Sequence, residues 1–207
     1  MKRPPSVTGA SPRIGLLSLQ GAFIEHVGIL RLLGAEVTEV RLPAQLAPLD
    51  GLIIPGGEST TMGKLAETFE LLEPLRVFSR SRPTWGICAG MIALAAEIRG
   101  ERPLLGTLGI SVVRNAFGRQ VDSFEIDLDI PVLPGEPRPF PAVFIRAPKF
   151  EAAEQKNLVI LARLPDGSPA AVRQEHLLAT SFHPELTDDL RFHQYFLDMV
   201  AEHRAGS

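Results

Sequence analysis

Short apolar runs that end at glycine or proline limit the folds open to this chain more than any other feature. Residues 51–54 form a continuous apolar run that is closed by Pro55-Gly56-Gly57, as expected of a parallel strand that is buried on both faces and followed by a tight loop. Stretches with apolar residues at helical spacing separate this run from similar ones at residues 14–19 and 83–87. The alternation predicts an α/β fold, a three-layer sandwich in which helices flank a mostly parallel central sheet.

The remaining elements are predicted from periodicity. Helices are expected over residues 22–33, 89–96 and 188–202, and a further helix carries four apolar residues on one side, Leu65, Phe69, Leu72 and Leu75. Further strands are expected at residues 36–41, 124–130, 142–145, 158–163, 170–174 and 177–181. Residues 124–130 alternate strictly between apolar and charged, which predicts a strand exposed on one face and a small antiparallel excursion in the second half of the chain.

Length and composition predict one domain. The chain has 207 residues, of which 45% are hydrophobic and 22% charged, and these values are typical of a folded globular protein. Residues 1–13 include three prolines and show no apolar periodicity. We therefore expect a flexible extension there, a single domain over residues 14–203 and a short tail at residues 204–207.

The charge balance and the single cysteine bear on partners and location. A net charge of −3 provides no basic field for a nucleic acid or an anionic membrane, and the apolar runs are far shorter than the ~20 residues of a membrane-spanning helix. Cys88 is the only cysteine and cannot form an intrachain disulfide, which fits a reducing compartment. We therefore expect a cytoplasmic protein with neither a nucleic acid nor a membrane as partner.

Cys88 lies in the pattern of a nucleophile elbow. Gly86 and Gly90 stand two residues away on either side, between a predicted strand and a predicted helix. In such an elbow a sharp turn presents the nucleophile above the sheet, and the unpaired N–H groups of a helix N-terminus favour a thiolate. A cysteine that only packs in the core is the alternative, but the flanking glycines favour a nucleophile.

A base and a carboxylate follow a predicted strand near the carboxyl end. His183 and Glu185 flank Pro184; residues two apart in extended backbone face the same side, and the proline keeps His183 out of helical geometry. A thiol nucleophile needs an imidazole to take its proton, and the imidazole needs a third group to orient it. His183 and Glu185 supply those parts for Cys88, and an ordinary surface loop is the alternative. The chain's other histidines lack this combination of strand end and adjacent carboxylate: His26, His176, His193 and His203.

The Gly56-Gly57 loop offers backbone donors. Its N–H groups can point into the crevice at the carboxyl ends of the strands, where open α/β sheets bind ligands. Such donors suit either an oxyanion hole or a phosphate cradle. The loop has neither the lysine of a Walker A motif nor the spacing of a dinucleotide fingerprint, which favours the oxyanion hole.

Together these segments resemble the class I glutamine amidotransferases and, more narrowly, the glutaminase subunits of pyridoxal phosphate synthase. The narrower resemblance covers about residues 14–203 and rests on six motifs in the same order. The motifs are Leu19-Gln20-Gly21 with Glu25-His26, Pro55-Gly56-Gly57-Glu58-Ser59-Thr60, Cys88-Ala89-Gly90-Met91, Arg114-Asn115-Ala116-Phe117-Gly118-Arg119-Gln120, Phe144-Ile145-Arg146-Ala147-Pro148 and Phe182-His183-Pro184-Glu185-Leu186.

The resemblance implies hydrolysis of L-glutamine to glutamate and ammonia through a glutamyl thioester. Cys88 would attack the side-chain amide, His183 would transfer the proton, and Glu185 would orient His183. The backbone N–H groups of Gly57 and Ala89 are expected to form the oxyanion hole. The residues expected to contact glutamine are Gly57, Glu58, Ser59, Arg114, Ile145 and Arg146. Gln20 is expected either to line the site or to face a partner, and surface ion pairs are the alternative for the two arginines.

The same resemblance implies a protein partner, the synthase subunit of the pyridoxal 5'-phosphate synthase complex, which would take up ammonia before water protonates it. No cofactor or metal is implied, because one cysteine and scattered histidines give no metal-ligand spacing. The alternatives are a glutaminase of another biosynthetic complex, such as one for imidazole or nucleotide synthesis, a cysteine peptidase or stress protein of similar fold, and a non-catalytic regulatory subunit. The motif at residues 114–120 and the three filled triad positions argue against them.

Overall fold

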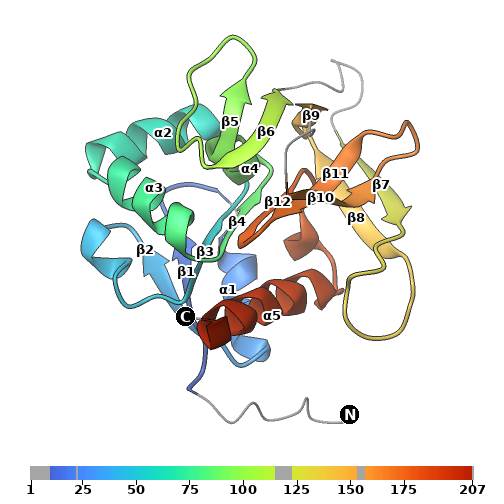
Figure 1. Cartoon of the computed structure of the whole chain (residues 1–207), viewed down its shortest axis with the longest axis horizontal. Coiled ribbons are helices and arrows are strands. Elements are labelled where there is room, and N and C mark those ends of the chain that lie inside the picture. Colours follow the sequence, from blue (N-terminus) through green and yellow to red (C-terminus); the bar gives the residue numbers. More distant parts are fainter. Residues whose placement is uncertain (1–9, 22, 115–122, 153–156, 207) are drawn as a thin grey trace.

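The short apolar runs of the sequence form the central sheet. A computed structural model describes residues 10–21, 23–114, 123–152 and 157–206. Seven strands form the sheet in the order β10-β11-β12-β4-β3-β1-β2 (Figure 1). Their bounds are β1 (Arg13–Leu17), β2 (Glu36–Val40), β3 (Gly51–Ile54), β4 (Thr84–Ile87), β10 (Leu158–Arg163), β11 (Pro169–Gln174) and β12 (Leu177–Thr180). Strands β2, β1, β3, β4 and β12 run parallel, and β11 and β10 add an antiparallel edge.

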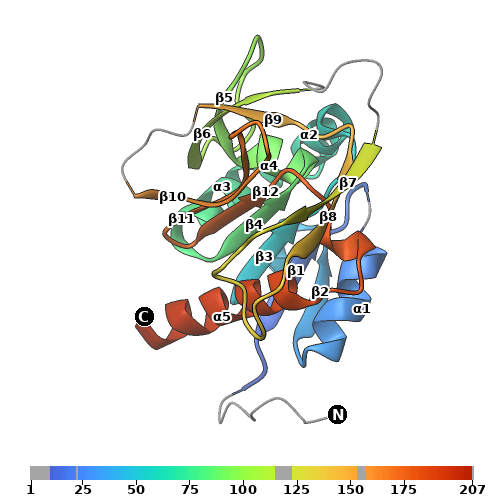
Figure 2. The same cartoon turned by 90° about the vertical axis from the view of Figure 1, so that its right-hand side faces the viewer.

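Helices cover both faces of this sheet, as the continuous apolar strands require. In β3, Ile53 belongs to the core cluster shared with α1 (Ile24–Leu32) and α5 (Arg191–Gly206), while Leu52 and Ile54 belong to the cluster on the other face. The second cluster contains residues of α2 (Ser59–Thr68), α3 (Leu72–Ser81) and α4 (Ala89–Leu94). The layers are visible in Figure 2 and confirm the predicted three-layer α/β sandwich.

Two small sheets lie outside the central one. The pair β7 (Ser123–Leu128) and β8 (Phe140–Ile145) is antiparallel, which confirms the predicted antiparallel segment. The β7 residues Glu125 and Asp127 are exposed, as expected of a strand with one face in solvent. A second sheet joins β5 (Ala95–Ile98), β6 (Leu108–Val113) and β9 (Lys149–Ala152). Two short 3₁₀ helices complete the elements, η1 (Pro43–Gln45) and η2 (Pro184–Leu186).

The prediction of a single helix that carries Leu65, Phe69, Leu72 and Leu75 is wrong. The chain forms two helices instead, because α2 ends at Thr68 and Glu70 takes a left-handed conformation with φ 55°. The N–H of Glu70 bonds the carbonyl of Glu67, and the N–H of Leu71 bonds that of Ala66 at 2.7 Å. This pair of bonds is a Schellman motif, which usually has glycine at the left-handed position. Phe69 is exposed as a result.

Other bounds also differ from the sequence-based ones. The predicted strands at residues 51–54 and 158–163 match β3 and β10, whereas the helix expected over residues 89–96 ends at Leu94, because the following residues pair with β6 as strand β5. Strands β5, β6 and β9 were not predicted. The last helix begins at Arg191, after a turn in which Arg191 binds the buried carboxylate of Asp189.

The N-terminal extension lies mostly outside the described residues. Arg13 already belongs to β1, and its N–H donates to Asp50 Oδ2 at 2.7 Å. The division into an extension, a domain at residues 14–203 and a tail stays a prediction, although α5 continues through Gly206.

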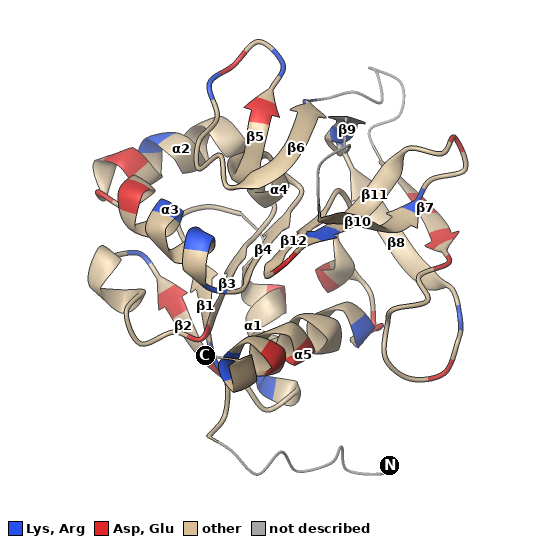
Figure 3. Cartoon of the chain, in the orientation of Figure 1, with Lys and Arg blue, Asp and Glu red and all other residues tan. Residues whose placement is uncertain are grey.

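Acidic and basic residues are interspersed along the described part of the chain, as the coloured ribbon of Figure 3 shows. Of the helices in the described ranges, none combines the length and the apolar character that crossing a membrane requires.

Candidate active site

Four loops at one edge of the sheet bring the predicted site together. Gln20 follows β1, Gly56 and Gly57 follow β3, Cys88 follows β4, and His183 follows β12. These four strands are mutually parallel, so their carboxyl ends lie at one edge. That edge is where open α/β sheets bind ligands.

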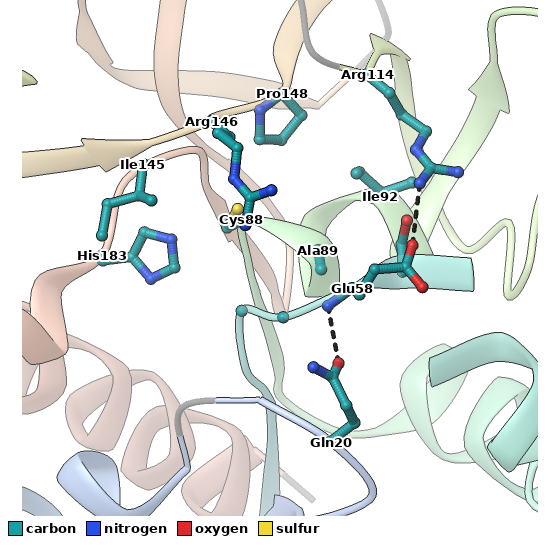
Figure 4. A pocket seen from close by; sticks show the side chains of 13 residues that line it. Gln20, Glu58, Cys88, Ala89, Ile92, Arg114, Ile145, Arg146, Pro148 and His183 are labelled. Carbon is teal, nitrogen blue, oxygen red and sulfur yellow. Dashed lines mark hydrogen bonds and ion pairs between the residues drawn. The ribbon is translucent and has the colours of Figure 1, made fainter. Parts of the chain in front are cut away.

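The loops enclose a cavity of about 410 Å³, seen from close by in Figure 4. Its lining residues are Gln20, Gly56, Gly57, Glu58, Ser59, Cys88, Ala89, Ile92, Arg114, Ile145, Arg146, Pro148 and His183. Every residue proposed from the sequence for the reaction or for glutamine is among them except Glu185, which lies behind His183.

Cys88 occupies a strained turn between β4 and α4. Its φ of 50° and ψ of −103° fall in a sparsely populated region that costs ~1–3 kcal/mol and is often found at functional sites. The flanking glycines are required by close packing: a Cβ atom on Gly86 would lie less than 3.0 Å from the backbone of Gly90, and one on Gly90 less than 3.0 Å from the carbonyl oxygen of Ile54. The N–H of Cys88 donates to the carbonyl of Thr180 at 2.8 Å, which ties the elbow to β12.

His183 lies between a sulfur and a carboxylate. Its Nδ1 lies 2.7 Å from Glu185 Oε1, and Cys88 and His183 line the same cavity. Burial lowers the pKa of His183, but the neighbouring Cys88 and the hydrogen bond and charge of Glu185 outweigh burial and raise that pKa to about 10. The ring is therefore held as an imidazolium, the partner that a reactive thiolate requires.

A backbone hydrogen bond from the β7–β8 sheet fixes the position of His183. The N–H of His183 donates to the carbonyl of Val143 in β8 at 2.8 Å. Pro184 and Glu185 belong to the 3₁₀ helix η2, and Glu185 is only 5% exposed. The antiparallel pair of β7 and β8 thus holds the backbone of His183 in place.

Replacing Glu185 with glutamine is expected to lower the pKa of His183, because the carboxylate is one of the groups that raise it. In the wild type, the contribution of His183 to the free energy of unfolding is fully present below the ordinary pKa of 6.5 and is lost as the pH rises toward about 10. An NMR titration that follows the His183 ring protons gives the pKa of His183 in the wild type and in the Glu185→Gln variant. The exposed Glu175→Gln is the matched control, and an unchanged pKa of His183 in Glu185→Gln would refute the pairing.

Glu58 caps helix α2 and is ionised. Its carboxylate accepts from the N–H groups of Thr60 at 3.0 Å and Thr61 at 2.7 Å. The hydroxyl of Thr61, followed by the N–H groups of Thr60 and Thr61, lowers the pKa of Glu58 to about 2. One face of this carboxylate is therefore occupied by the helix N-terminus.

Arg114 lines the cavity and also forms ion pairs. Its Nη1 lies 3.0 Å from both carboxylate oxygens of Glu101, and its Nη2 lies 3.3 Å from Glu58 Oε1 (Figure 4). Glu101 was not predicted, since its sequence context contains no motif that points to the site. The rest of the motif that begins at Arg114, residues 115–120, lies outside the described residues.

Gln20 lines the cavity, which is one of the two positions expected from the sequence. Its Oε1 accepts from the N–H of Glu58 at 2.8 Å, as the lower dashed line in Figure 4 shows. A Cβ atom on Gly57 would lie 2.5 Å from that oxygen. The side chain of Gln20 is thus packed against the loop whose donors are expected to form the oxyanion hole.

Two buried histidines, His26 and His193, lie on the side of Glu185 that faces away from His183. His26 Nε2 is 3.6 Å from Glu185 Oε2, and His26 Nδ1 is 2.8 Å from His193 Nε2. His26 lies in helix α1 and not at a strand end, but the packing of α1 against η2 brings it to Glu185. The pair Glu25-His26 within the first motif was the available signal.

Comparison with known proteins places this chain in a family. The model of the SNO glutamine amidotransferase family matches residues 16–202. A protein of Dehalococcoides mccartyi named pyridoxal 5'-phosphate synthase subunit PdxT is 55% identical over 93% of this chain and 99% of its own length, and a protein of the same name from Frankia alni is 53% identical over 95% and 99%. A crystal structure of a glutamine amidotransferase, 49% identical, has a TM-score of 0.83 and covers 91% of this chain and 98% of its own. The chain belongs to the SNO glutamine amidotransferase family.

Proposed function

We propose that this protein is a glutaminase that hydrolyses L-glutamine to glutamate and ammonia and delivers the ammonia to a pyridoxal 5'-phosphate synthase subunit. The observation that carries the proposal is the order Cys88, His183, Glu185: Cys88 occupies a strained elbow and lines the same cavity as His183, and His183 Nδ1 lies 2.7 Å from Glu185 Oε1. The name shared by the relatives, subunit PdxT of pyridoxal 5'-phosphate synthase, supports the destination of the ammonia.

The geometry suits acyl transfer in two halves. The thiolate of Cys88 attacks the side-chain amide carbon, and His183 donates its proton to the departing nitrogen, so that ammonia leaves and a glutamyl thioester remains. Water then gives a proton to His183 and attacks the thioester. Glutamate leaves, and the proton on His183 and the thiolate are restored.

The negative oxygen of each tetrahedral intermediate needs fixed donors. We assign them to the backbone N–H groups of Gly57 and Ala89. Ala89 is the first residue of α4, and the first N–H groups of a helix have no intrahelical acceptor. Gly57 lines the same cavity as Ala89.

The rim of the cavity is suited to a free amino acid. Arg114 and Arg146 are cations that can pair with the α-carboxylate of glutamine, while the ionised Glu58 can accept from its α-ammonium group. Ser59 and Ile145 complete the proposed contacts. All five residues line the cavity.

Replacing Arg114 with alanine is expected to raise the KM for glutamine about tenfold or more, because a hydrogen bond to a charged group contributes ~1.5–3 kcal/mol. The kcat should change less, since Arg114 is remote from the reacting bond. Steady-state kinetics test this, with Arg80→Ala on the exposed side of α3 as the matched control. A KM for glutamine within twofold of the wild-type value would refute binding of glutamine by Arg114, whose role would then be limited to its ion pairs with Glu58 and Glu101.

The experiment that tests the whole proposal follows the amide nitrogen of glutamine into the product. The chain is combined with the synthase subunit and given glutamine labelled with ¹⁵N at the side-chain amide, in a large excess of unlabelled ammonium. Labelled pyridoxal 5'-phosphate is the expected product. Release of labelled ammonia without labelled product would retain the glutaminase but refute this synthase as its partner, and no release from glutamine would refute the activity.

A further inference from the structure

A buried polar cluster of Glu185, His26 and His193 extends from the proposed triad into the core. Glu185 uses one carboxylate oxygen for His183, while the side chains of both Glu185 and His26 are fully buried. Within the described part of the chain, three buried side-chain nitrogen or oxygen atoms have no hydrogen-bond partner, and all three lie here: Glu185 Oε2, His26 Nε2 and His193 Nδ1. Two of them, His26 Nε2 and Glu185 Oε2, face each other at 3.6 Å.

The cluster is held rigidly by four elements. His26 comes from α1, His193 from α5, Glu185 from η2 and Trp85 from β4. The ring centroid of Trp85 lies 6.2 Å from that of His26 and 5.2 Å from that of His193, in edge-on contacts. Trp85 Nε1 in turn donates to Thr180 Oγ1 at 3.2 Å. Such packing fixes ring orientations, which is the condition for a side chain to orient another.

Both histidines are neutral. Burial, followed by the neighbouring His193 and His183, holds the pKa of His26 well below its ordinary value, and burial lowers the pKa of His193 to about 3. A neutral imidazole has one N–H and one lone pair. The 2.8 Å contact between His26 Nδ1 and His193 Nε2 therefore contains one proton, which belongs to one ring or the other.

The carboxylate decides between these two arrangements. If His26 Nδ1 carried the proton, the lone pair of its Nε2 would face the Glu185 carboxylate, which is repulsive. If His193 Nε2 carries it, His26 Nε2 is an N–H that faces Oε2, and the contact becomes a charge-assisted hydrogen bond. The separation of 3.6 Å is longer than such a bond, and catalytic hydrogen bonds often tighten only when substrate is bound.

We propose that His26 is a positioning residue of the active site: oriented by His193, its Nε2–H donates to Glu185 Oε2 and fixes the carboxylate that orients His183. The inference rests on the proposed glutaminase function. It extends the triad by two residues and gives each Glu185 oxygen its own imidazole donor, so that neither oxygen of this buried carboxylate is left unpaired during turnover.

The kinetic test compares a variant that removes the donor with one that keeps it. His26→Leu removes the N–H, and His26→Gln places an amide N–H near the position of Nε2. In the complex with the synthase subunit, His26→Leu is expected to lower kcat about tenfold with KM for glutamine within twofold of wild type, and His26→Gln to recover most of the kcat. His176→Leu, which loses a bond to the Ser79 carbonyl far from the triad, is the matched control and should retain the wild-type kcat.

A second measurement does not depend on turnover. The ¹⁵N spectrum of histidine-labelled wild-type protein, with signals assigned by the His26→Gln and His193→Gln variants, is expected to show both rings protonated at Nε2. A wild-type protein that hydrolyses no glutamine would refute the proposed function, while this spectrum would still decide the pairing.

The outcomes separate cleanly. Protonation of His26 at Nδ1, a His26→Leu variant with kcat within twofold of wild type, or a His26→Gln variant as impaired as His26→Leu would each overturn the inference. If His26→Leu does not fold, His26→Gln and the spectrum decide, and a kcat of His26→Gln below one tenth of wild type would count against the positioning role.

Discussion

Replacing Cys88 with alanine is expected to lower glutamine hydrolysis at least about 10³-fold, because the thioester route needs the sulfur and no neighbouring group replaces it. The fold should be unaffected. Alanine removes only the sulfur of Cys88, a residue that is 8% exposed and lines the cavity, and the backbone hydrogen bond from residue 88 to the carbonyl of Thr180 remains. Ammonia release at saturating glutamine, measured with the thermal unfolding curve of the same sample, gives the result.

A covalent label checks the same nucleophile independently. A glutamine-derived electrophile should modify wild-type protein stoichiometrically at Cys88 and leave Cys88→Ala unlabelled, as mapped by mass spectrometry. Full activity in Cys88→Ala, or an adduct on another residue, would remove Cys88 from the mechanism.

Replacing Gly56 with alanine is expected to lower kcat about 10²-fold while the protein stays folded. The backbone of Gly56 lies outside the positive-φ region, so alanine is not conformationally excluded. Its Cβ would lie less than 3.0 Å from His183 Cε1 and 3.1 Å from Nδ1. Because Glu185 holds Nδ1 of this ring at 2.7 Å, the methyl group displaces the imidazole from its position beside Glu185 and Cys88, and displacements of ~1 Å at a reacting group cost about 10²-fold.

Gly28 in α1 provides the matched control for this substitution. A Cβ atom there meets no atom within 4 Å, and alanine in an exposed helix is favoured by ~0.5–1 kcal/mol over glycine. Gly28→Ala should keep wild-type kcat and unfold at the same or a slightly higher temperature. Wild-type kcat in Gly56→Ala would show that the ring of His183 has room to move without loss.

The parallel sheet and the contact between His183 and Glu185 could be predicted because their signals are local. The apolar run before Gly56-Gly57 marks a buried strand, and the glycines around Cys88 mark a sharp turn. His183 and Glu185 do meet, but Glu185 lies in the 3₁₀ helix η2 and not in the extended backbone that was expected. The sheet topology then brings these loops to one edge, since parallel strands end together. The glycine pair at 86 and 90 proved to be required by contacts with backbone rather than by positive φ.

What could not be predicted depends on contacts between distant segments or on atypical residues. Glu70 takes a left-handed position that usually belongs to glycine, so the helix break after Thr68 has no sequence marker. The pairing of Arg114 with Glu101 and of His26 with His193 joins side chains from separate elements. Both pairs follow from packing, not from spacing along the chain. A cytoplasmic location and the roles of the glutamine contacts stay predictions.

The position of β12 has a consequence for how activity arises during synthesis. This strand lies inside the sheet, between β4 and β11, yet it comes last in chain order among the described strands, and His183 follows it directly. A nascent chain that already displays its sulfur therefore has no imidazole beside it until the carboxyl-terminal quarter of the polypeptide docks. We therefore expect no glutamine hydrolysis by a nascent chain in which β12 has not yet joined the sheet.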